Sequence, residues 1–255
     1  MKKIFEKTTV LGVRVDLISL DELVEYILFS VQNQTKAIIS NVNVHAINIA
    51  YRHPWFKDFI NQSEVVFCDG FGVKWAASFL DRKKIQRFTP PDWFDRLAGK
   101  CADQGISMFF LGAKQNVIEK AAMAVSEKFP KLKIAGIHHG YFDKDPFSAD
   151  NREVTSTINS VQPDILIVGF GMPTQEKWIL ENYADLRAKV IIPVGAFFDY
   201  KAGEVVRAPK WMTDHGLEWL GRLIIEPGRL WKRYIIGNPI FLWRVLLQKC
   251  NIIKH

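Results

Sequence analysis

The sequence predicts an α/β fold, with a mostly parallel, Rossmann-like sheet covered by helices on both faces. Short apolar runs suited to buried strands alternate with segments whose apolar residues recur at helical spacing. Such alternation is typical of βαβ units. Residues 206–255 differ, because they are basic, rich in tryptophan and helical in pattern. We therefore expect an α/β core over residues 1–205 and a basic helical appendage over residues 206–255.

The same patterns predict the order of the elements. The chain opens with an extended segment, TVLGVRVDL, and a capping box at Ser19–Glu22 begins an amphipathic helix that ends near Phe29. Strand patterns follow at residues 37–40, 64–69, 85–88, 106–112, 132–137, 164–171 and 189–195. Helical patterns follow at residues 44–51, 73–80, 92–103, 116–129, 147–160 and 174–183. Strands that alternate with helices in this way are expected to run parallel.

Composition and charge narrow the class of protein. Its 48% hydrophobic and 24% charged residues are typical of a soluble globular protein. The three cysteines form no CxxC pair, which predicts a reducing compartment and no zinc site. Charged residues interrupt the apolar stretch that an export signal needs, and no run approaches the roughly 18 apolar residues of a membrane span. We expect a location in the cytoplasm or on the inner face of a membrane.

The positive charge is concentrated at the end of the chain. Seven Lys or Arg and one Glu lie between Trp219 and His255, so this segment carries 7 − 1 = +6 of the net +7. Pro227 and Pro239 divide it into helices too short to span a bilayer. The asymmetry favours an anionic membrane surface as partner. The alternative is a helical pair docked on the core with its tryptophans buried.

Asp69 stands where a strand passes into a helix, in VVFCDGFG (65–72). Ligands of open α/β sheets bind at the carboxyl ends of the strands. Position alone also allows a simpler role, because Asp is a favoured N-cap residue. If Asp69 acts in chemistry, the neighbouring helix N-terminus is expected to keep it ionised and to weaken it as a base.

Other strand ends carry glycines and polar groups. Neither GFG turn, at 70–72 or 169–171, completes a GxGxxG motif, which disfavours a dinucleotide site. The helix start after Pro173 could hold a phosphate on its free N–H groups, or could be a tight turn alone. A third strand end, PVGAFFD, finishes at Asp199. Convergence of these ends at one edge supports a nucleotide-type ligand.

Two further motifs invite a metal site. His138 and His139 are adjacent in an extended segment, so their side chains are expected on opposite faces and not around one metal ion. Asp143-Lys144-Asp145 is a DxD sequence, the motif with which many sugar-nucleotide transferases hold a divalent cation. It lies in a polar loop before a proline, where a solvated turn is the expected structure.

Together, five motifs resemble those of the WecG/TagA/CpsF family, glycosyltransferase family 26. They are CDGFGV (68–73), HHGYF (138–142), PDILIVGFGMPTQEKWI (163–179), FFDYKAGEVVRAPKW (197–211) and GLEWLGRLIIEPGRLWKRY (216–234). The resemblance covers nearly the whole chain and keeps the family order. It implies an inverting transferase, with no metal or other cofactor, that moves a hexose from UDP to an undecaprenyl-diphosphate-linked sugar. Such enzymes build wall teichoic acid linkers, enterobacterial common antigen or exopolysaccharide.

The resemblance also implies roles for single residues, and with it Asp69 is expected to be the catalytic base rather than a cap. The other expected catalytic positions are Arg87, Gln175 and Asn41. Substrate contacts are expected at Asn43, Tyr141, Gly171, Asp199, Arg222, Arg229 and Lys232. The last three lie in the appendage, which is expected to associate with the inner leaflet of the cytoplasmic membrane and to bring cations to the active site. Nucleic acid is not an expected partner, and the oligomeric state is left open.

Departures from the family pattern leave the donor and the acceptor open. SNVNVH stands where many relatives have TPN, and Lys232-Arg233 where Arg-Arg is common. Pro90 and Ala196 both replace a glycine. The donor is therefore expected to be an N-acetylmannosamine-type or a glucose-type UDP-sugar. The alternative function is a non-catalytic sugar-nucleotide-binding or scaffold protein of a membrane assembly complex.

Overall fold

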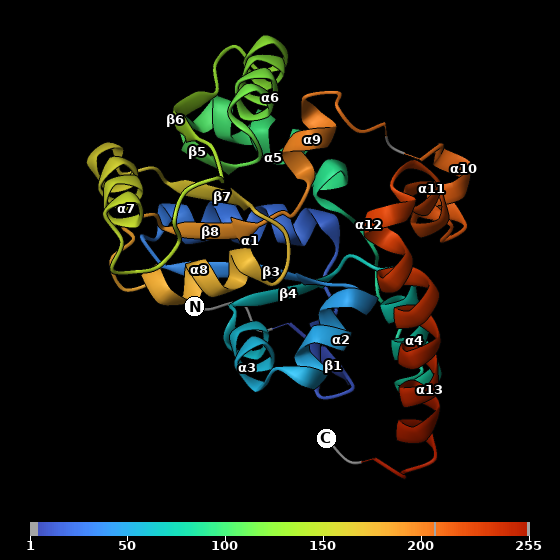
Figure 1. Cartoon of the computed structure of the whole chain (residues 1–255). Helices are drawn as coiled ribbons and strands as arrows, with labels where there is room; N and C mark the ends of the chain where they lie inside the picture. Colours follow the sequence, from blue (N-terminus) through green and yellow to red (C-terminus); the bar gives the residue numbers. More distant parts are fainter. Residues whose placement is uncertain (1–4, 207, 254–255) are drawn as a thin grey trace.

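A six-stranded parallel sheet forms the centre of the computed structural model, which describes residues 5–206 and 208–253 (Figure 1). Its strands, in spatial order, are β4 (Val65–Cys68), β3 (Ala37–Val42), β8 (Val190–Pro193), β7 (Ile165–Gly169), β5 (Ser107–Gly112) and β6 (Lys133–His138). Every neighbouring pair is parallel. The predicted fold class is confirmed.

Helices cover both faces of this sheet and bury a separate hydrophobic core on each. One core involves α1 (Leu20–Gln32), α5 (Pro90–Gln104) and α6 (Gln115–Lys128). The other involves α2 (Val44–Arg52), α3 (Pro54–Gln62), α4 (Phe71–Asp81), α7 (Ala149–Val161) and α8 (Thr174–Asn182). Alternate strand residues serve the two cores: Met108 and Phe110 face one, and Phe109 and Leu111 the other. Burial on both faces explains the continuous apolar strands.

Some predicted elements differ from the structure. The first extended segment is an antiparallel hairpin of β1 (Lys7–Val10) and β2 (Val13–Asp16), because Leu11 and Gly12 turn the chain with positive φ. The predicted strand at 85–88 is wrong. The segment buries Ile85 and Phe88 without regular structure, and the Phe88 N–H donates a hydrogen bond to Cys68 O at the end of β4. Helices α3 and α9 (Phe197–Lys201) were not predicted.

The C-terminal segment is helical, as predicted. It consists of α10 (Lys210–Asp214), α11 (Glu218–Ile225), α12 (Pro227–Trp231), a π-helical turn η1 (Lys232–Ile236) and α13 (Gly237–Lys249). Helix α13 packs against α2 and α4 and buries Phe241 and Val245 in the core. No helix in the described part of the chain is long and apolar enough to cross a membrane. The division into two domains stays a prediction.

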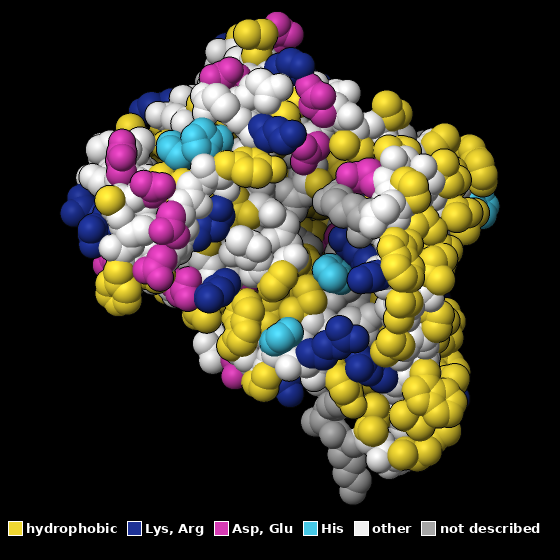
Figure 2. All heavy atoms as spheres, viewed as in Figure 1, with side chains coloured by type: hydrophobic (Ala, Val, Ile, Leu, Met, Phe, Trp, Pro, Cys, Tyr) yellow, Lys and Arg dark blue, Asp and Glu magenta, His cyan; other side chains and the backbone are white. Residues whose placement is uncertain are grey.

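The tail is docked on the core, yet its tryptophans are not simply buried. Trp243 is 62% exposed and Trp211 is 58% exposed. Figure 2 shows hydrophobic side chains along the C-terminal helices, over the outer side of the molecule. They include Ile224, Ile225, Trp231, Ile235, Ile236, Leu242, Trp243 and Leu246. The alternative of a helical pair docked on the core is therefore right for the side of the tail that buries Phe241 and Val245. It is wrong for the outer side, where Trp211 and Trp243 are exposed.

Candidate active site

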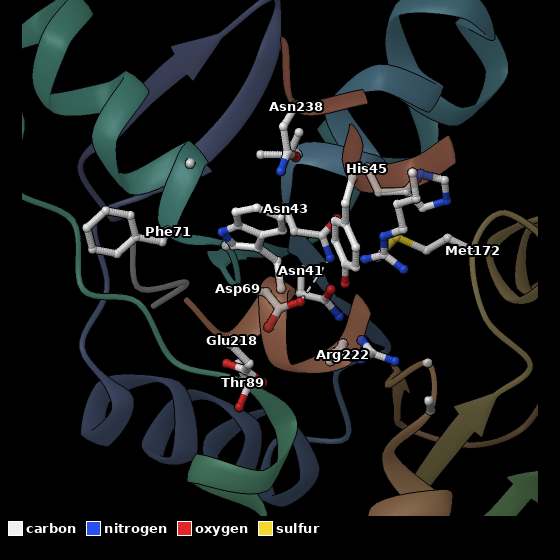
Figure 3. A pocket seen from close by; sticks show the side chains of 18 of the residues that line it. Asn41, Asn43, His45, Asp69, Phe71, Thr89, Met172, Glu218, Arg222 and Asn238 are labelled. Atoms are coloured by element: carbon white, nitrogen blue, oxygen red, sulfur yellow. Dashed lines mark hydrogen bonds between the residues drawn. The ribbon is translucent and has the colours of Figure 1, made fainter. Parts of the chain in front are cut away.

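A cavity of about 580 Å³ lies between the sheet and the C-terminal helices. One wall comes from the loops at the carboxyl ends of β3, β4, β7 and β8. The opposite wall comes from the segment 216–242. In the close-up view Asp69, Asn43, Glu218 and Arg222 project toward the same hollow (Figure 3). The cavity is thus at the sheet edge where open α/β sheets bind ligands.

Asp69 follows β4 directly and is held by a neighbouring amide. Its backbone N–H donates to Val42 O at the end of β3, and its Oδ2 accepts from Asn43 Nδ2 at 3.0 Å. Asn43 is itself fixed, because its Oδ1 accepts from Ala46 N–H as the N-cap of α2. The N-cap of α4 is Gly70, so Asp69 does not cap that helix.

The electrostatic surroundings of Asp69 differ from the expectation. Burial raises the pKa of its carboxyl group, and the nearby Glu218 raises it further. The hydrogen bond from Asn43 and the charges of Arg87 and Arg233 act in the opposite direction and are outweighed. The expected weakening by the helix N-terminus is therefore wrong, and the raised pKa makes Asp69 a better proton acceptor.

Arg87 lines the cavity and joins its two walls. Its Nη1 donates to Glu218 Oε2 at 3.0 Å, and its Nη2 donates to the Thr213 carbonyl oxygen at 3.4 Å. The guanidinium group is largely enclosed, with 14% of the side chain exposed. Arg87 therefore links the core to α11. It also pairs with the carboxylate of Glu218, which lies close enough to Asp69 to affect its pKa.

Gln175 lies behind the cavity wall and organises it. Its Oε1 accepts from the backbone N–H groups of Gly171 (3.1 Å) and Gly195 (3.0 Å), and its Nε2 donates to Glu176 Oε1 at 2.7 Å. Both glycines line the cavity and have positive φ, which favours glycine. Glu176 is fully buried, and burial raises its pKa to about 7. Gln175 thus couples the loops after β7 and β8.

Of the other site residues predicted in the α/β core, some line the cavity and others lie outside it. Asn41 lines it and donates from Nδ2 to Pro193 O at 2.9 Å, which links β3 to β8. Tyr141 is 70% exposed and does not line the cavity, because it follows β6 at the far edge of the sheet. Asp199 lies in α9 and does not line it either.

The tail contributes cations and aromatic rings. Arg222 lines the cavity with its guanidinium carbon 5.7 Å from the centre of the Tyr200 ring, and its buried Nε has no hydrogen-bond partner in the described part of the chain. Lys232 is exposed beside the Trp231 ring and lies outside the cavity. Arg233 lines the cavity in its place. The side chain of Arg229 is outside the described residues.

Several cavity residues were missed by the sequence predictions. They are His45, Tyr200, Glu218, Trp219, Arg233 and Tyr234. Arg233 belongs to the π-helical turn η1, and no local sequence motif predicts its i→i+5 hydrogen-bond pattern. His45 lies two residues after Asn43 in the first turn of α2, and this position next to a strand end is the signal that could have identified it.

The two metal motifs lie away from the cavity. The rings of His138 and His139 are 4.5 Å apart, so the expectation of opposite faces is wrong, because β6 ends between them. Asp143 and Asp145 form a local turn, with Asp143 Oδ1 accepting from Asp145 N–H at 3.0 Å. This confirms the expected polar turn. Among the described residues, no group of three or more His, Cys, Asp or Glu is arranged to hold a metal ion.

Comparison with known proteins gives one consistent result. The model of the Glycosyl transferase WecG/TagA/CpsF family matches residues 8–254. A relative from Bacillus subtilis (strain 168) is 34% identical over 216 residues, 84% of this chain and 81% of that protein. A relative from Staphylococcus aureus (strain NCTC 8325 / PS 47) is 30% identical over 254 residues, 97% and 95% of the two chains. Both relatives are named N-acetylglucosaminyldiphosphoundecaprenol N-acetyl-beta-D-mannosaminyltransferase.

Proposed function

This chain belongs to the WecG/TagA/CpsF family of glycosyltransferases, and from that premise we propose that it transfers a hexose from a UDP-sugar to a polyprenyl-diphosphate-linked sugar. The proposal rests mainly on the surroundings of Asp69. The pKa of its carboxyl group is raised, and it faces a cavity whose opposite wall contains arginines. A proton acceptor opposite a group of cations suits the attack of a hydroxyl group on a sugar phosphate.

The proposed reaction is a single displacement with inversion. The acceptor hydroxyl oxygen forms a bond to the anomeric carbon while the bond from that carbon to the UDP phosphate oxygen breaks. The hydroxyl proton passes to Asp69, which Asn43 holds in place. Negative charge develops on the leaving diphosphate, and we assign its stabilisation to Arg222, whose Nε has no hydrogen-bond partner among the described residues. The proposal includes no metal ion.

The names of the relatives indicate which substrates to test first. We propose an N-acetylmannosamine-type donor and an N-acetylglucosamine-diphosphate-polyprenol acceptor, with a glucose-type donor as the alternative. Pro90 and Ala196 both line the cavity, so these two substitutions are placed to affect the fit of the sugar. The product would serve the synthesis of a bacterial cell-surface polysaccharide.

We further propose that the protein works as a peripheral protein on the inner face of the cytoplasmic membrane. Many of its exposed apolar side chains lie along the tail, which is also the basic part of the chain. Tryptophan favours the headgroup region, and each Lys or Arg near an anionic leaflet adds about 1 kcal/mol to binding. Attachment there would bring the cavity to an acceptor that is itself anchored by its lipid.

A panel of UDP-hexoses tests the proposed function. The purified chain is incubated with each donor and a lipid-linked acceptor, and UDP release and product mass are measured with and without excess EDTA. We expect one donor to yield both UDP and a heavier lipid, unaffected by EDTA. A chain that binds a UDP-sugar but forms no product with any donor would support the scaffold alternative. Loss of activity in EDTA with recovery on adding Mn²⁺ would refute metal independence.

A further inference from the structure

A group of basic side chains, three arginines and one histidine, lies beside the cavity, where α2 meets the C-terminal segment. It consists of His45 and Arg52 from α2, Arg233 from η1 and Arg244 from α13, and we call it the cationic cluster. His45 and Arg52 are seven positions apart, so they lie on one side of α2. His45 and Arg233 line the cavity. The roles assigned above to Asp69, Asn43 and Arg222 involve none of the four directly.

The members of the cationic cluster are close enough to influence one another. The pKa of His45 is lowered to about 4, chiefly by burial and then by the charges of Arg233 and Arg52. The pKa of Arg244 is lowered by burial, and Arg52 lowers it further. None of the salt bridges between described residues involves Arg52 or Arg244. The three arginines of the cluster therefore concentrate positive charge at one place, and His45 beside them is uncharged near pH 7.

One asparagine holds this part of the protein together. Asn48 donates from Nδ2 to Gly237 O at 2.8 Å and accepts at Oδ1 from Arg244 Nη1 at 3.0 Å. The Arg244 guanidinium group also lies over the Tyr51 ring, 3.7 Å from its centre. Like charges repel, so fixing them together without a ligand is unfavourable. A bound anion would remove that cost, which is how preorganised anion sites work.

Apolar surface borders the cationic cluster. Ile235 and Leu242 line the cavity and are also exposed, and the apolar surface continues through Ile236, Trp243 and Leu246. Figure 2 shows the same arrangement, with Lys and Arg side chains lying between the hollow and the hydrophobic tail. A free nucleotide or inorganic phosphate would use only the charges. A ligand with a phosphate head and a hydrocarbon chain would use both surfaces.

We propose that the cationic cluster binds the diphosphate of the lipid-linked acceptor, and that the adjoining apolar surface binds the first isoprene units of its lipid. The inference rests on the proposed function for the identity of the acceptor. It separates two phosphate sites: Arg222 serves the diphosphate of the donor, and the cationic cluster serves that of the acceptor. With its diphosphate at the cluster, the acceptor sugar would extend into the cavity toward Asp69.

Farnesyl diphosphate provides a probe that is not itself a glycosyl acceptor. Its binding to the full chain is measured for the wild type and for Arg52→Gln, Arg233→Gln and Arg152→Gln. Arg52 is exposed, so its replacement should not disturb folding, and Arg152 is an exposed arginine on α7 that serves as the matched control. We expect Arg52→Gln and Arg233→Gln to raise the Kd about tenfold or more, Arg152→Gln to leave it unchanged, and neither Arg52→Gln nor Arg152→Gln to change the Kd of UDP. Equal binding by Arg52→Gln and Arg152→Gln would overturn the inference.

A second probe separates the acceptor from ordinary phospholipid. Vesicles containing phosphatidylglycerol should sediment with Arg52→Gln as well as with Arg152→Gln, because the site is assigned to a diphosphate. If Arg52→Gln loses vesicle binding but keeps farnesyl diphosphate binding, the cluster recognises phospholipid headgroups and the inference is wrong.

Kinetics then separate this inference from the proposed function. With a lipid-linked acceptor, Arg52→Gln should raise the KM of the acceptor and leave that of the donor unchanged. An unchanged acceptor KM in an active enzyme would contradict the inference alone. A wild type that transfers no hexose, but whose affinity for farnesyl diphosphate depends on Arg52, would refute the proposed function and still support the cationic cluster as a diphosphate site.

Discussion

The wall of the cavity that belongs to the sheet and the wall that belongs to the tail carry different kinds of side chain. The sheet wall presents a carboxylate and amides, Asp69, Asn41 and Asn43, at strand ends. The tail wall presents cations and aromatic rings, among them Arg222, Arg233 and Trp219. A proton acceptor needs an exact position, which buried parallel strands provide. Phosphate and lipid binding need charge and apolar area, and the short helices of the tail carry both.

The sharpest way to test this comparison is to remove the carboxylate. We expect Asp69→Asn to lower kcat by about 10² to 10⁴, the usual contribution of a positioned general base. The affinity for UDP should stay unchanged, because the shape of the side chain is kept. Steady-state transfer and UDP titration measure the two quantities, with the exposed Asp103→Asn as control. Wild-type turnover by Asp69→Asn would mean that the sheet wall does not supply the base.

Removing a cation from the tail wall should have the next largest effect. Arg222→Gln is expected to lower kcat about 100-fold, since one lost hydrogen-bond donor to a developing charge costs that much. The measurement is single-turnover transfer at saturating donor, so that weaker donor binding does not contribute. A loss no larger than that of the exposed Arg152→Gln variant would show that Arg222 does not stabilise the leaving group.

Glu176, which accepts a hydrogen bond from Gln175 behind the sheet wall, should make the stability of the protein depend on pH. Burial raises the pKa of Glu176 from 4.5 to about 7, so the folded state keeps a proton that the unfolded state loses. Stability should therefore fall as pH rises between about 4.5 and 7, by about 3 kcal/mol in all.

Glu176→Gln cannot ionise and should lack this part of the pH dependence. Urea unfolding of both proteins at pH 5 and pH 8 gives the comparison. We expect the variant to gain up to about 3 kcal/mol in unfolding free energy relative to the wild type on going to pH 8. If the two proteins lose stability in parallel, Glu176 does not hold a proton in the folded state.

The smallest expected effect concerns the outer side of the tail. Trp243 is 62% exposed, and Trp243→Ala should weaken binding to anionic vesicles by about 1 kcal/mol, or roughly fivefold. Phe147 is 84% exposed in the loop after β6, so Phe147→Ala is the matched control. Sedimentation at one salt concentration measures both variants. Equal losses for the two would mean that the tail does not form the membrane contact.

The sheet wall was largely predictable and the tail wall was not. Asn41 lies near the end of an apolar strand, and Asn43, Asp69 and Gly171 follow such strands. The carboxyl ends of parallel strands converge on one edge. Strand order, however, depends on pairing between distant segments. The position of β6 at the far edge, which keeps Tyr141 out of the cavity, therefore could not be read from local pattern.

In the tail, one local irregularity decides which cation faces inward. The π-helical turn η1 departs from the regular helical spacing, and Arg233 lines the cavity while Lys232 is exposed. Sequence periodicity assumes regular turns and therefore does not capture this difference. The segment 82–89 shows a similar limit, since its apolar residues are buried without forming a strand.

The central claim is that Asp69 accepts the proton while Arg222 of the tail wall stabilises the negative charge of the leaving diphosphate. The pH dependence of transfer tests this claim most directly. The kcat/KM of the wild type should fall at low pH as Asp69 becomes protonated, starting above the ordinary range of an aspartate because burial raises its pKa. Arg222→Gln should keep this acidic limb at a lower rate, and Glu176→Gln should keep it too. The residual activity of Asp69→Asn should lack it. An acidic limb that persists unchanged in Asp69→Asn would contradict the account.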